Sequence, residues 1–348
     1  MSEQVQFKFR HVGANGNVEG FLAKRGRIEG ETLELGREAI PVGAIMKVFT
    51  RANRVILVIN TGAPEPATMA LEVYSNRRPL VSALNRACSV MWVKVERAKL
   101  EKAGRAHEFR AEVCPVCSCT LGLSRRAVTP QTYCEFCDAI YPTGATADTL
   151  TEDQQYRCCD TCGLFAKPSL FTTFYFYFLL VVFGWRYQQS HRCNSCMRGE
   201  AWKMLLINAP FVLGLFVAVP QLVRAYFGGS TMSAKYGGLD SANAAAKAGK
   251  WEAAVEGYRQ IEERLGSCAG VRFNRGMVLA HHQKLPEAAL AMEEALADCS
   301  NYRPAFNALA AIYDAMKEHD AASALRAQWI ELDSIDDRPP AEIEPAMA

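Results

Sequence analysis

Eight cysteines arranged in four C-x-x-C pairs constrain the fold of this chain more than any other feature of its sequence. The pairs are Cys114/Cys117, Cys134/Cys137, Cys159/Cys162 and Cys193/Cys196. In a chain of 348 residues this spacing is typical of metal binding in a reducing compartment rather than of a disulfide framework. We therefore expect the pairs to meet two by two, with each group of four thiolates holding one ion.

The first two pairs, CPVC and CEFC, are separated by sixteen residues, a spacing typical of a zinc ribbon. We predict this ribbon over residues 108–141. Four thiolates complete the tetrahedral shell of Zn²⁺ and leave no open position for water, so the site is expected to be structural rather than catalytic. Cys119, two residues beyond the second ligand, is expected to be a spare thiol.

The other two pairs enclose the apolar stretch LFTTFYFYFLLVVFGWRY (residues 170–187), for which two interpretations compete. As a membrane helix it would form a two-span hairpin with the next apolar segment, with both ends of the chain in the cytosol. As a pair of strands it would join the two knuckles of a second zinc ribbon over residues 155–200. The interpretations exclude each other, because thiolates on opposite faces of a bilayer cannot share one ion.

We favour the second ribbon. Residues 170–185 would extend about 24 Å as a helix, short of the roughly 30 Å hydrocarbon core, and their Phe, Tyr, Val and Thr side chains favour strands. The layout CDTCG, an aromatic run ending in FGWRY, then CNSC resembles a bacterial zinc-ribbon family whose knuckles are joined by an apolar hairpin. The proline that follows the aromatic run in that family is absent here. His191 is an alternative ligand for this second structural zinc ion.

A transmembrane helix is predicted over residues 203–227, because MLLINAPFVLGLFVAVPQLVRAY (204–226) carries no charge before Arg224 and is long enough to cross a bilayer. The N-terminus does not look like a signal peptide. With a single span, the larger number of positive charges before it places the N-terminal zinc domains in the cytoplasm and the rest outside. There, Cys268 and Cys299 are candidates for a disulfide.

Short apolar runs bounded by turn residues predict a β-rich domain over residues 1–106, closed by a helix at 79–105. The strands are expected at 5–9, 19–23, 32–35, 44–50, 54–59 and 69–75. The phrase LELGREAIPVGAIMKVFTRANRVILVI resembles the small barrels of the pleckstrin-homology-like (PH-like) and GRAM type, which often bind lipid headgroups or peptides. Five basic residues suggest either a basic patch or a scattered solvated face, and we favour the scattered face; they are Lys8, Arg10, Lys24, Arg25 and Arg27.

Residues 238–335 repeat with a period of 34, which places Ala254 on Ala288 and then on Ala322, and Tyr258 on Met292. Small residues at fixed positions of this period resemble the tetratricopeptide repeat (TPR). The resemblance implies an all-α stack of helical hairpins with a concave face that binds peptides or partner proteins. The acidic, proline-rich tail, residues 336–348, is expected to be disordered.

The sequence shows no catalytic motif such as G-x-S-x-G or H-E-x-x-H. The adjacent His281 and His282 point to different helix faces and are not expected to bind metal together. A formal charge of +2 gives no argument for a nucleic-acid partner, and no small-molecule substrate is expected.

Together these features predict a multidomain, membrane-anchored, non-enzymatic adaptor. It would consist of a PH-like barrel with a C-terminal helix, two zinc ribbons, a transmembrane helix and TPR repeats that bind a partner protein. Two alternatives remain open. One is a transmembrane signalling regulator whose ribbons contact nucleic acid or the transcription machinery. The other is a thiol oxidoreductase acting through Cys159 and Cys162.

Overall fold

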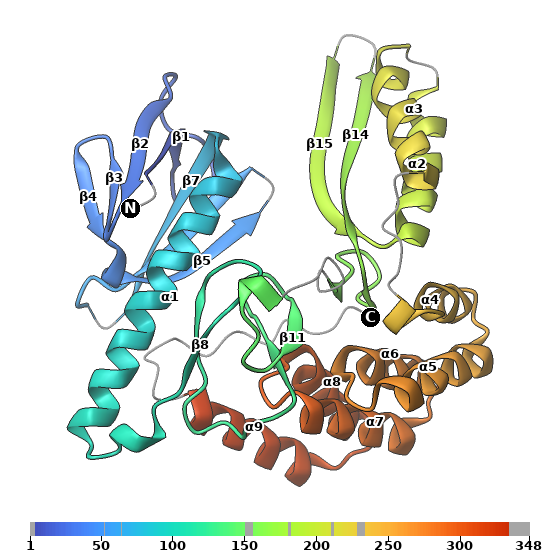
Figure 1. The fold of residues 1–348 in the computed structure, drawn as a ribbon. Helices are drawn as coiled ribbons and strands as arrows, with labels where there is room; N and C mark the ends of the chain where they lie inside the picture. The colour runs from blue at the N-terminus through green and yellow to red at the C-terminus, as the bar shows by residue number, and fades with distance from the viewer. Residues whose placement is uncertain are drawn as a thin grey trace. The chain divides into compact units, whose positions relative to one another are not determined.

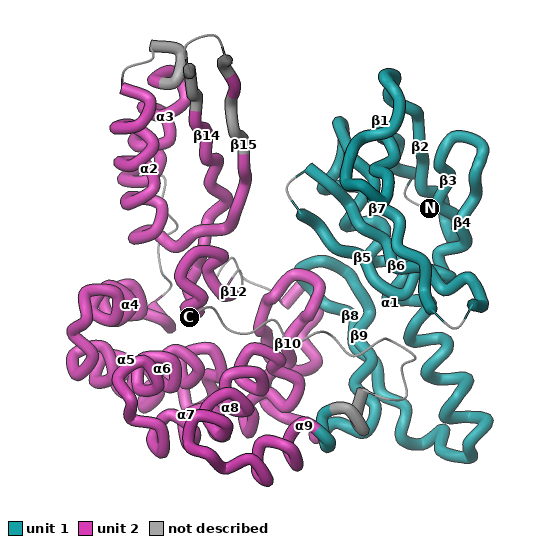
Figure 2. The backbone as a smooth tube through the Cα atoms, turned by 180° about the vertical axis from the view of Figure 1, so that it is seen from behind, with its two compact units in different colours: residues 1–126, 327–344 teal, residues 127–326, 345–348 magenta. Residues whose placement is uncertain are grey.

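The computed structural model describes residues 4–51, 53–63, 65–149, 156–179, 182–209, 212–227 and 234–333 (Figure 1). The chain divides into two compact units. One contains residues 1–126 and 327–344, and the other contains residues 127–326 and 345–348 (Figure 2).

The first unit is built on a seven-stranded antiparallel sheet with the strand order β4-β3-β2-β1-β7-β6-β5. The strands are β1 (Val5–Val12), β2 (Lys24–Glu29), β3 (Thr32–Leu35), β4 (Glu38–Pro41), β5 (Ile45–Arg51), β6 (Arg54–Ile59) and β7 (Ala67–Ser75). Strand β1 lies at the centre because its alternate residues Val5, Phe7 and Phe9 are buried, and it pairs with both β2 and β7. The strand predicted at residues 19–23 is wrong, since Phe21 is fully exposed in a bend.

Helix α1 (Arg77–Lys102) packs on this sheet through Leu80, Leu84 and Cys88, which are fully buried (Figure 1). The Trp92 indole donates a hydrogen bond to the carbonyl of Ile45 at 3.1 Å. Among the described residues β4 and β5 are the two edges of the sheet, so main-chain pairing does not close it into the predicted barrel. The likeness to PH-like domains stays a prediction.

Three of the four cysteine pairs lie on small two-stranded hairpins. These are β8 (Ala111–Val113) with β9 (Thr120–Gly122), β10 (Gln131–Tyr133) with β11 (Ile140–Pro142), and β12 (Arg157–Cys158) with β13 (Phe165–Ala166). A longer hairpin, β14 (Ser169–Leu179) with β15 (Val182–Arg192), follows them. This confirms the strand interpretation of the aromatic stretch for residues 170–179 and 182–187, whose β-branched and aromatic side chains favour an extended backbone.

The predicted transmembrane helix over residues 203–227 is wrong. Its residues are divided between the end of α2 (Asn194–Asn208) and the 16-residue helix α3 (Val212–Phe227), with residues 210–211 outside the described part. None of the helices in the described part of the chain is both long and apolar enough to cross a bilayer. The same finding overturns three further predictions: the single-pass location, the two-span alternative and the integral membrane association.

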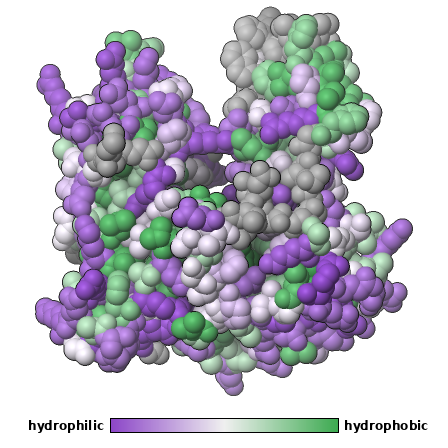
Figure 3. All heavy atoms as spheres, in the orientation of Figure 1, coloured by the Kyte–Doolittle hydropathy of each residue, from purple (hydrophilic) through white to green (hydrophobic). Residues whose placement is uncertain are grey.

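Helices α2 and α3 instead lie side by side against β14 (Figures 1 and 2). The fully buried Asn208 donates hydrogen bonds to the carbonyls of Phe174 and Met204, which fixes the end of α2 to the hairpin. Hydrophobic residues remain exposed on both helices, as Figure 3 shows. They include Trp202, Leu206, Phe216, Val223 and Phe227.

The C-terminal part of the chain is a stack of helices, as predicted. The helices are α4 (Leu239–Lys247), α5 (Trp251–Leu265), α6 (Ala269–His281), α7 (Leu285–Asp298), α8 (Arg303–Ala315) and α9 (His319–Asp333). The period of 34 is explained by packing, since Ala254, Ala288 and Ala322 are all 0 % exposed. Cys268 and Cys299 are both buried and are not joined to each other, so the disulfide considered above is not formed.

Candidate metal centres and their contacts with the repeats

Three of the four cysteine pairs share one turn geometry. In each, the N–H of the first cysteine donates a hydrogen bond to the carbonyl of the residue five positions later. The carbonyl of the same cysteine accepts a hydrogen bond from the N–H of the residue four positions later. At Cys159, the N–H bonds to the Leu164 carbonyl and the carbonyl accepts from the Gly163 N–H, both at 2.9 Å. The residue after the second cysteine takes a left-handed conformation, with φ of 60° at Ser118, 58° at Asp138 and 70° at Gly163.

The fourth pair is different from the predicted knuckle. Cys193 is the N-cap of α2 and Cys196 lies in its first turn, so the N–H of Met197 donates to the Cys193 carbonyl as the first turn of a helix. Helix N-termini favour thiolates because the helix dipole and unpaired N–H groups stabilise negative charge there. The C-x-x-C spacing fits a turn and a helix start equally well, which is why the sequence did not distinguish them.

The structure brings all eight predicted ligands together in two groups of four. The first cluster contains Cys114, Cys117, Cys134 and Cys137, and the second cluster contains Cys159, Cys162, Cys193 and Cys196. Within each cluster the four sulfur atoms lie within 4.8 Å of one another. Zinc–sulfur bonds of about 2.3 Å in a tetrahedron require sulfur atoms about 3.8 Å apart. The Sγ atoms of Cys162 and Cys193 in the second cluster lie 3.9 Å apart, close to this value. The 4.8 Å limit makes the first cluster compatible with zinc as well.

The second cluster also has the electrostatics of a cation site. The Cys162 thiol, hydrogen-bonded to Cys159, holds the pKa of the Cys159 thiol well below its ordinary value, and the same contact raises the pKa of Cys162. Four neighbouring thiols cannot all ionise unless a cation compensates their charge. The N–H of Cys193 adds a hydrogen bond to the Cys159 sulfur at 3.3 Å, as is expected for a metal-bound thiolate.

Lys247, on helix α4 of the repeats, completes the surroundings of the second cluster. Its Nζ atom donates to the sulfur of Cys193 at 2.8 Å and to that of Cys196 at 3.2 Å. Burial lowers the pKa of Lys247, but the hydrogen bond and charge of Cys193 outweigh this and raise it above its ordinary value. Zinc with four thiolates carries a net charge of about −2, which the ammonium partly neutralises. No local sequence signal points to Lys247.

Two other predicted candidates lie beside the clusters. His191 is not among the clustered ligands of the described residues. Its main chain instead exchanges hydrogen bonds with Asp160, from the His191 N–H to the carboxylate at 2.6 Å and from the Asp160 N–H to the His191 carbonyl at 2.9 Å. Cys119 is buried and, in the part of the chain that the structure describes, belongs to neither cluster.

Two of the five basic residues considered for a basic patch on the N-terminal sheet form ion pairs with acidic residues. Arg10 contacts the carboxylate of Glu72 at 3.3 Å, and Arg27 contacts that of Glu34 at 2.7 Å. Each of these arginines shares its charge with an acid on a neighbouring strand, which favours the scattered, solvated face over a basic patch.

An extended segment next to the second cluster lies against the repeats. The N–H of Phe165 donates to Asn274 Oδ1 at 2.6 Å, and its carbonyl accepts from Asn274 Nδ2 at 2.8 Å and Asn243 Nδ2 at 3.0 Å. Both asparagines are buried, at 0 % and 2 % exposure. They bond to each other at 3.0 Å, and the Tyr258 hydroxyl donates to Asn243 at 2.8 Å, so their orientation is fixed.

The Phe165 side chain fills a slot beside these amides. It is 2 % exposed, and its ring lies 5.8 Å from that of Tyr156 and 5.9 Å from that of Tyr236. Helix α6 comes close only because residue 270 is glycine: a Cβ atom there would lie 2.4 Å from the ring. The slot therefore depends on one glycine.

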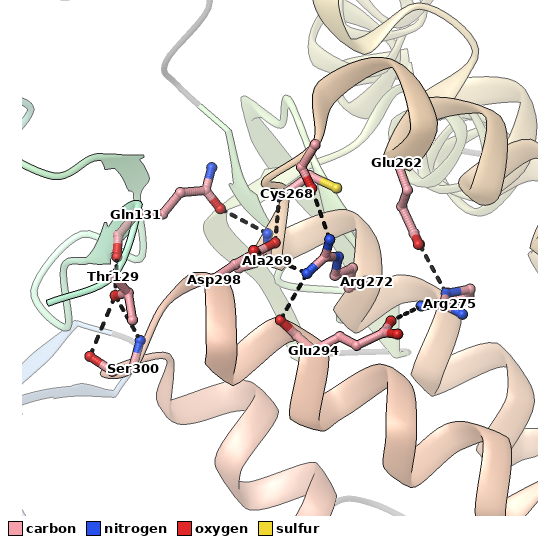
Figure 4. Close-up of polar contacts among 11 residues, drawn as sticks. Thr129, Gln131, Glu262, Cys268, Ala269, Arg272, Arg275, Glu294, Asp298 and Ser300 are labelled. Atoms are coloured by element: carbon pink, nitrogen blue, oxygen red, sulfur yellow. Dashed lines mark hydrogen bonds and ion pairs between the residues drawn. The ribbon is translucent and has the colours of Figure 1, made fainter. Parts of the chain in front are cut away.

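Strand β10 meets the repeats in a similar way. Asn301 accepts from the Tyr133 N–H at 2.9 Å and donates to the Tyr133 carbonyl at 2.7 Å. The Gln131 side chain accepts a hydrogen bond from the N–H of Ala269 at 2.8 Å, at the start of α6 (Figure 4). We call the surface formed by Asn243, Asn274 and Asn301 the asparagine face.

Ion pairs hold the helices behind this face in place. Arg275 of α6 contacts Glu262 of α5 at 2.9 Å and also pairs with Glu294 of α7 (Figure 4). Arg272 contacts Asp298 at 3.0 Å, and that carboxylate accepts the Cys268 N–H at 2.7 Å. Helix α6, which carries Asn274 of this face, is thus fixed from both sides.

Comparisons with known proteins assign neither a family nor a function to this chain. No protein-family model matches the sequence, and no curated protein matches it. A solved structure of MamA (AMB-1, P212121) is 18 % identical over a match that covers 40 % of this chain and 79 % of that one, with a TM-score of 0.25. A score this low carries no argument. The assignment of helical repeats therefore rests on the buried positions at period 34.

Proposed function

We propose that this chain is a non-enzymatic protein-binding scaffold with two structural zinc ions and a helical-repeat array of the TPR type. The observation that carries the proposal is the way Asn243 and Asn274 bind the main chain of an extended segment at Phe165. Side-chain amides that donate and accept in one plane can bind a peptide main chain whatever its sequence. Repeat proteins use such extended surfaces to bind other polypeptides.

The donor set of both clusters supports zinc in a structural role. Soft thiolate ligands select zinc over the hard cations magnesium and calcium. A complete set of four thiolates leaves no position at which a metal-bound water molecule could react, which supports a scaffold rather than a catalytic centre. The thiol oxidoreductase alternative is less well supported, because each C-x-x-C pair faces a second pair within 4.8 Å.

Site-specific photo-crosslinking tests the protein-binding role. A photoreactive amino acid would replace the exposed residues His281 on α6 and Ala311 on α8 in the full-length chain, expressed in the cells that make it. Phe21, fully exposed in the N-terminal unit, provides the matched control. We expect a discrete adduct with a second polypeptide from the repeat positions but not from position 21. Equal adducts from all three positions, or none from the repeats, would contradict the proposal.

A further inference from the structure

The asparagine face is occupied by the chain itself. At Phe165 the N–H and the carbonyl are both bonded to side chains of the repeats, and the ring fills the slot over Gly270. Asn243 and Asn274 come from two different helices, α4 and α6, and both bind the same residue. An extended segment bound by its main chain and one aromatic side chain is what a peptide ligand of this surface would look like.

We propose that the part of the asparagine face formed by Asn243 and Asn274, with the slot over Gly270, is a binding groove for an extended polypeptide segment with one large aromatic side chain, and that residues 164–166 fill it as an internal ligand. A partner segment with the same chemistry enters when this internal ligand leaves. The inference rests on the protein-binding role proposed above, and adds the chemistry of the ligand and the condition under which it binds.

The second cluster holds the internal ligand in its bound position. The knuckle at Cys159 ends with the hydrogen bond from the Cys159 N–H to the Leu164 carbonyl, immediately before Phe165. On the repeat side, Lys247 bonds to the cluster one turn of α4 beyond Asn243, which bonds to Phe165. The start of the segment and the helix that binds it therefore meet at the same cysteines. Loss of the metal releases both.

Competition between an internal and an external ligand has a measurable consequence. A tethered segment acts at a high effective concentration, on the order of millimolar for a short connection. The apparent affinity for an external ligand falls in proportion to the fraction of empty groove, so a groove that is 90 % filled binds a free peptide about tenfold more weakly. Removing the Phe165 side chain from the slot should therefore raise the apparent affinity for the free peptide by about this factor.

The test uses a fluorescein-labelled peptide with the sequence of residues 163–169, GLFAKPS, and the zinc-loaded full-length chain, with binding followed by fluorescence anisotropy. Three proteins are compared: wild type, Phe165→Ala and the matched control Phe171→Ala. Phe171 is also a fully buried phenylalanine, but it packs against α2 and not against the repeats. A fourth protein, Phe165→Ala with Asn274→Ala, lacks the amide that binds the main chain twice.

We expect Phe165→Ala to bind the peptide about tenfold more tightly than wild type and Phe171→Ala, and the double variant to lose that gain. A peptide with Ala in place of Phe should not bind. Removing zinc from wild type with a chelator should raise peptide binding as well, which keeps the test independent of how well Phe165→Ala folds. The inference is overturned if neither Phe165→Ala nor chelation improves binding, or if the double variant binds as well as Phe165→Ala. Crosslinks from the repeats would then still support the protein-binding role, which separates the two proposals.

Discussion

Replacing Gly270 with alanine tests the packing of Phe165 on the repeats. The new Cβ atom would meet three ring atoms of Phe165 at 2.4, 2.4 and 2.6 Å, whereas carbon atoms in contact normally stay about 3.5–4.0 Å apart. The ring cannot move easily, because Asn274 bonds to both the N–H and the carbonyl of Phe165. Overpacking of this kind costs about 1–3 kcal/mol.

The helix itself gains from the same substitution, since alanine is better than glycine in a helix by about 0.5–1 kcal/mol. Because three ring atoms are met at these distances, the overpacking cost falls in the upper half of its range, about 2–3 kcal/mol, and the net destabilisation is about 1–2.5 kcal/mol. In a domain of 150–250 residues each kcal/mol lowers Tm by about 2–4 °C, so we expect a fall of about 2–10 °C. Thermal unfolding of the zinc-loaded full-length chain, followed by circular dichroism at a fixed scan rate, measures it.

Gly276→Ala on the same helix is the control. There the new Cβ would lie 2.7 Å from the Met292 Cε atom, the far end of a flexible side chain, and 3.3 Å from the Ala288 carbonyl oxygen, so less has to move than at Gly270. We expect its Tm to stay within about 2 °C of wild type, because the helix gain offsets the small repacking cost. If Gly270→Ala melts at or above the wild-type temperature, or no lower than Gly276→Ala, Phe165 does not occupy the slot described here.

Three further outcomes are expected. Asn274→Ala should destabilise the chain by about 2–4 kcal/mol in denaturant titration, because it leaves the buried N–H of Phe165 without its partner and weakens the bonding of its carbonyl; a loss below about 0.5 kcal/mol would contradict this. Lys247→Met should speed zinc release from the second cluster to a chromogenic chelator about tenfold, since a charge-assisted bond to sulfur is lost, and release from the first cluster should not change. The buried Cys268, whose pKa burial raises to about 12, should react with a thiol reagent at neutral pH only on unfolding, so fast labelling in the folded chain would argue against its placement.

The sequence predicted those features that depend on local spacing. The period of 34 identified Ala254, Ala288 and Ala322, all of which are fully buried. The C-x-x-C pairs identified both clusters because two thiolates at this spacing can reach one ion in either a turn or a first helical turn. The composition of the aromatic stretch at residues 170–187 predicted strands, because its side chains favour an extended backbone.

The remaining features depend on contacts that local patterns do not encode. The apolar segment at residues 204–226 has the hydropathy of a membrane helix, but the same residues also suit two helices that pack on a hairpin, with Asn208 buried and bonded to the carbonyl of Phe174 in that hairpin. Phe165 and Asn274 are 109 residues apart, and Lys247 is 54 residues from Cys193. No periodicity connects such pairs, so the asparagine face and the lysine at the metal site were found only in the folded chain.

The metal content of the purified full-length chain, measured by plasma mass spectrometry, tests the central claim most directly. We predict two zinc ions per chain, falling to one in Cys117→Ser, which disrupts the first cluster, and to one in Cys162→Ser, which disrupts the second. Zinc-free wild-type protein that keeps its helical circular dichroism, or a single ion lost in one variant only, would contradict the two-site structural role.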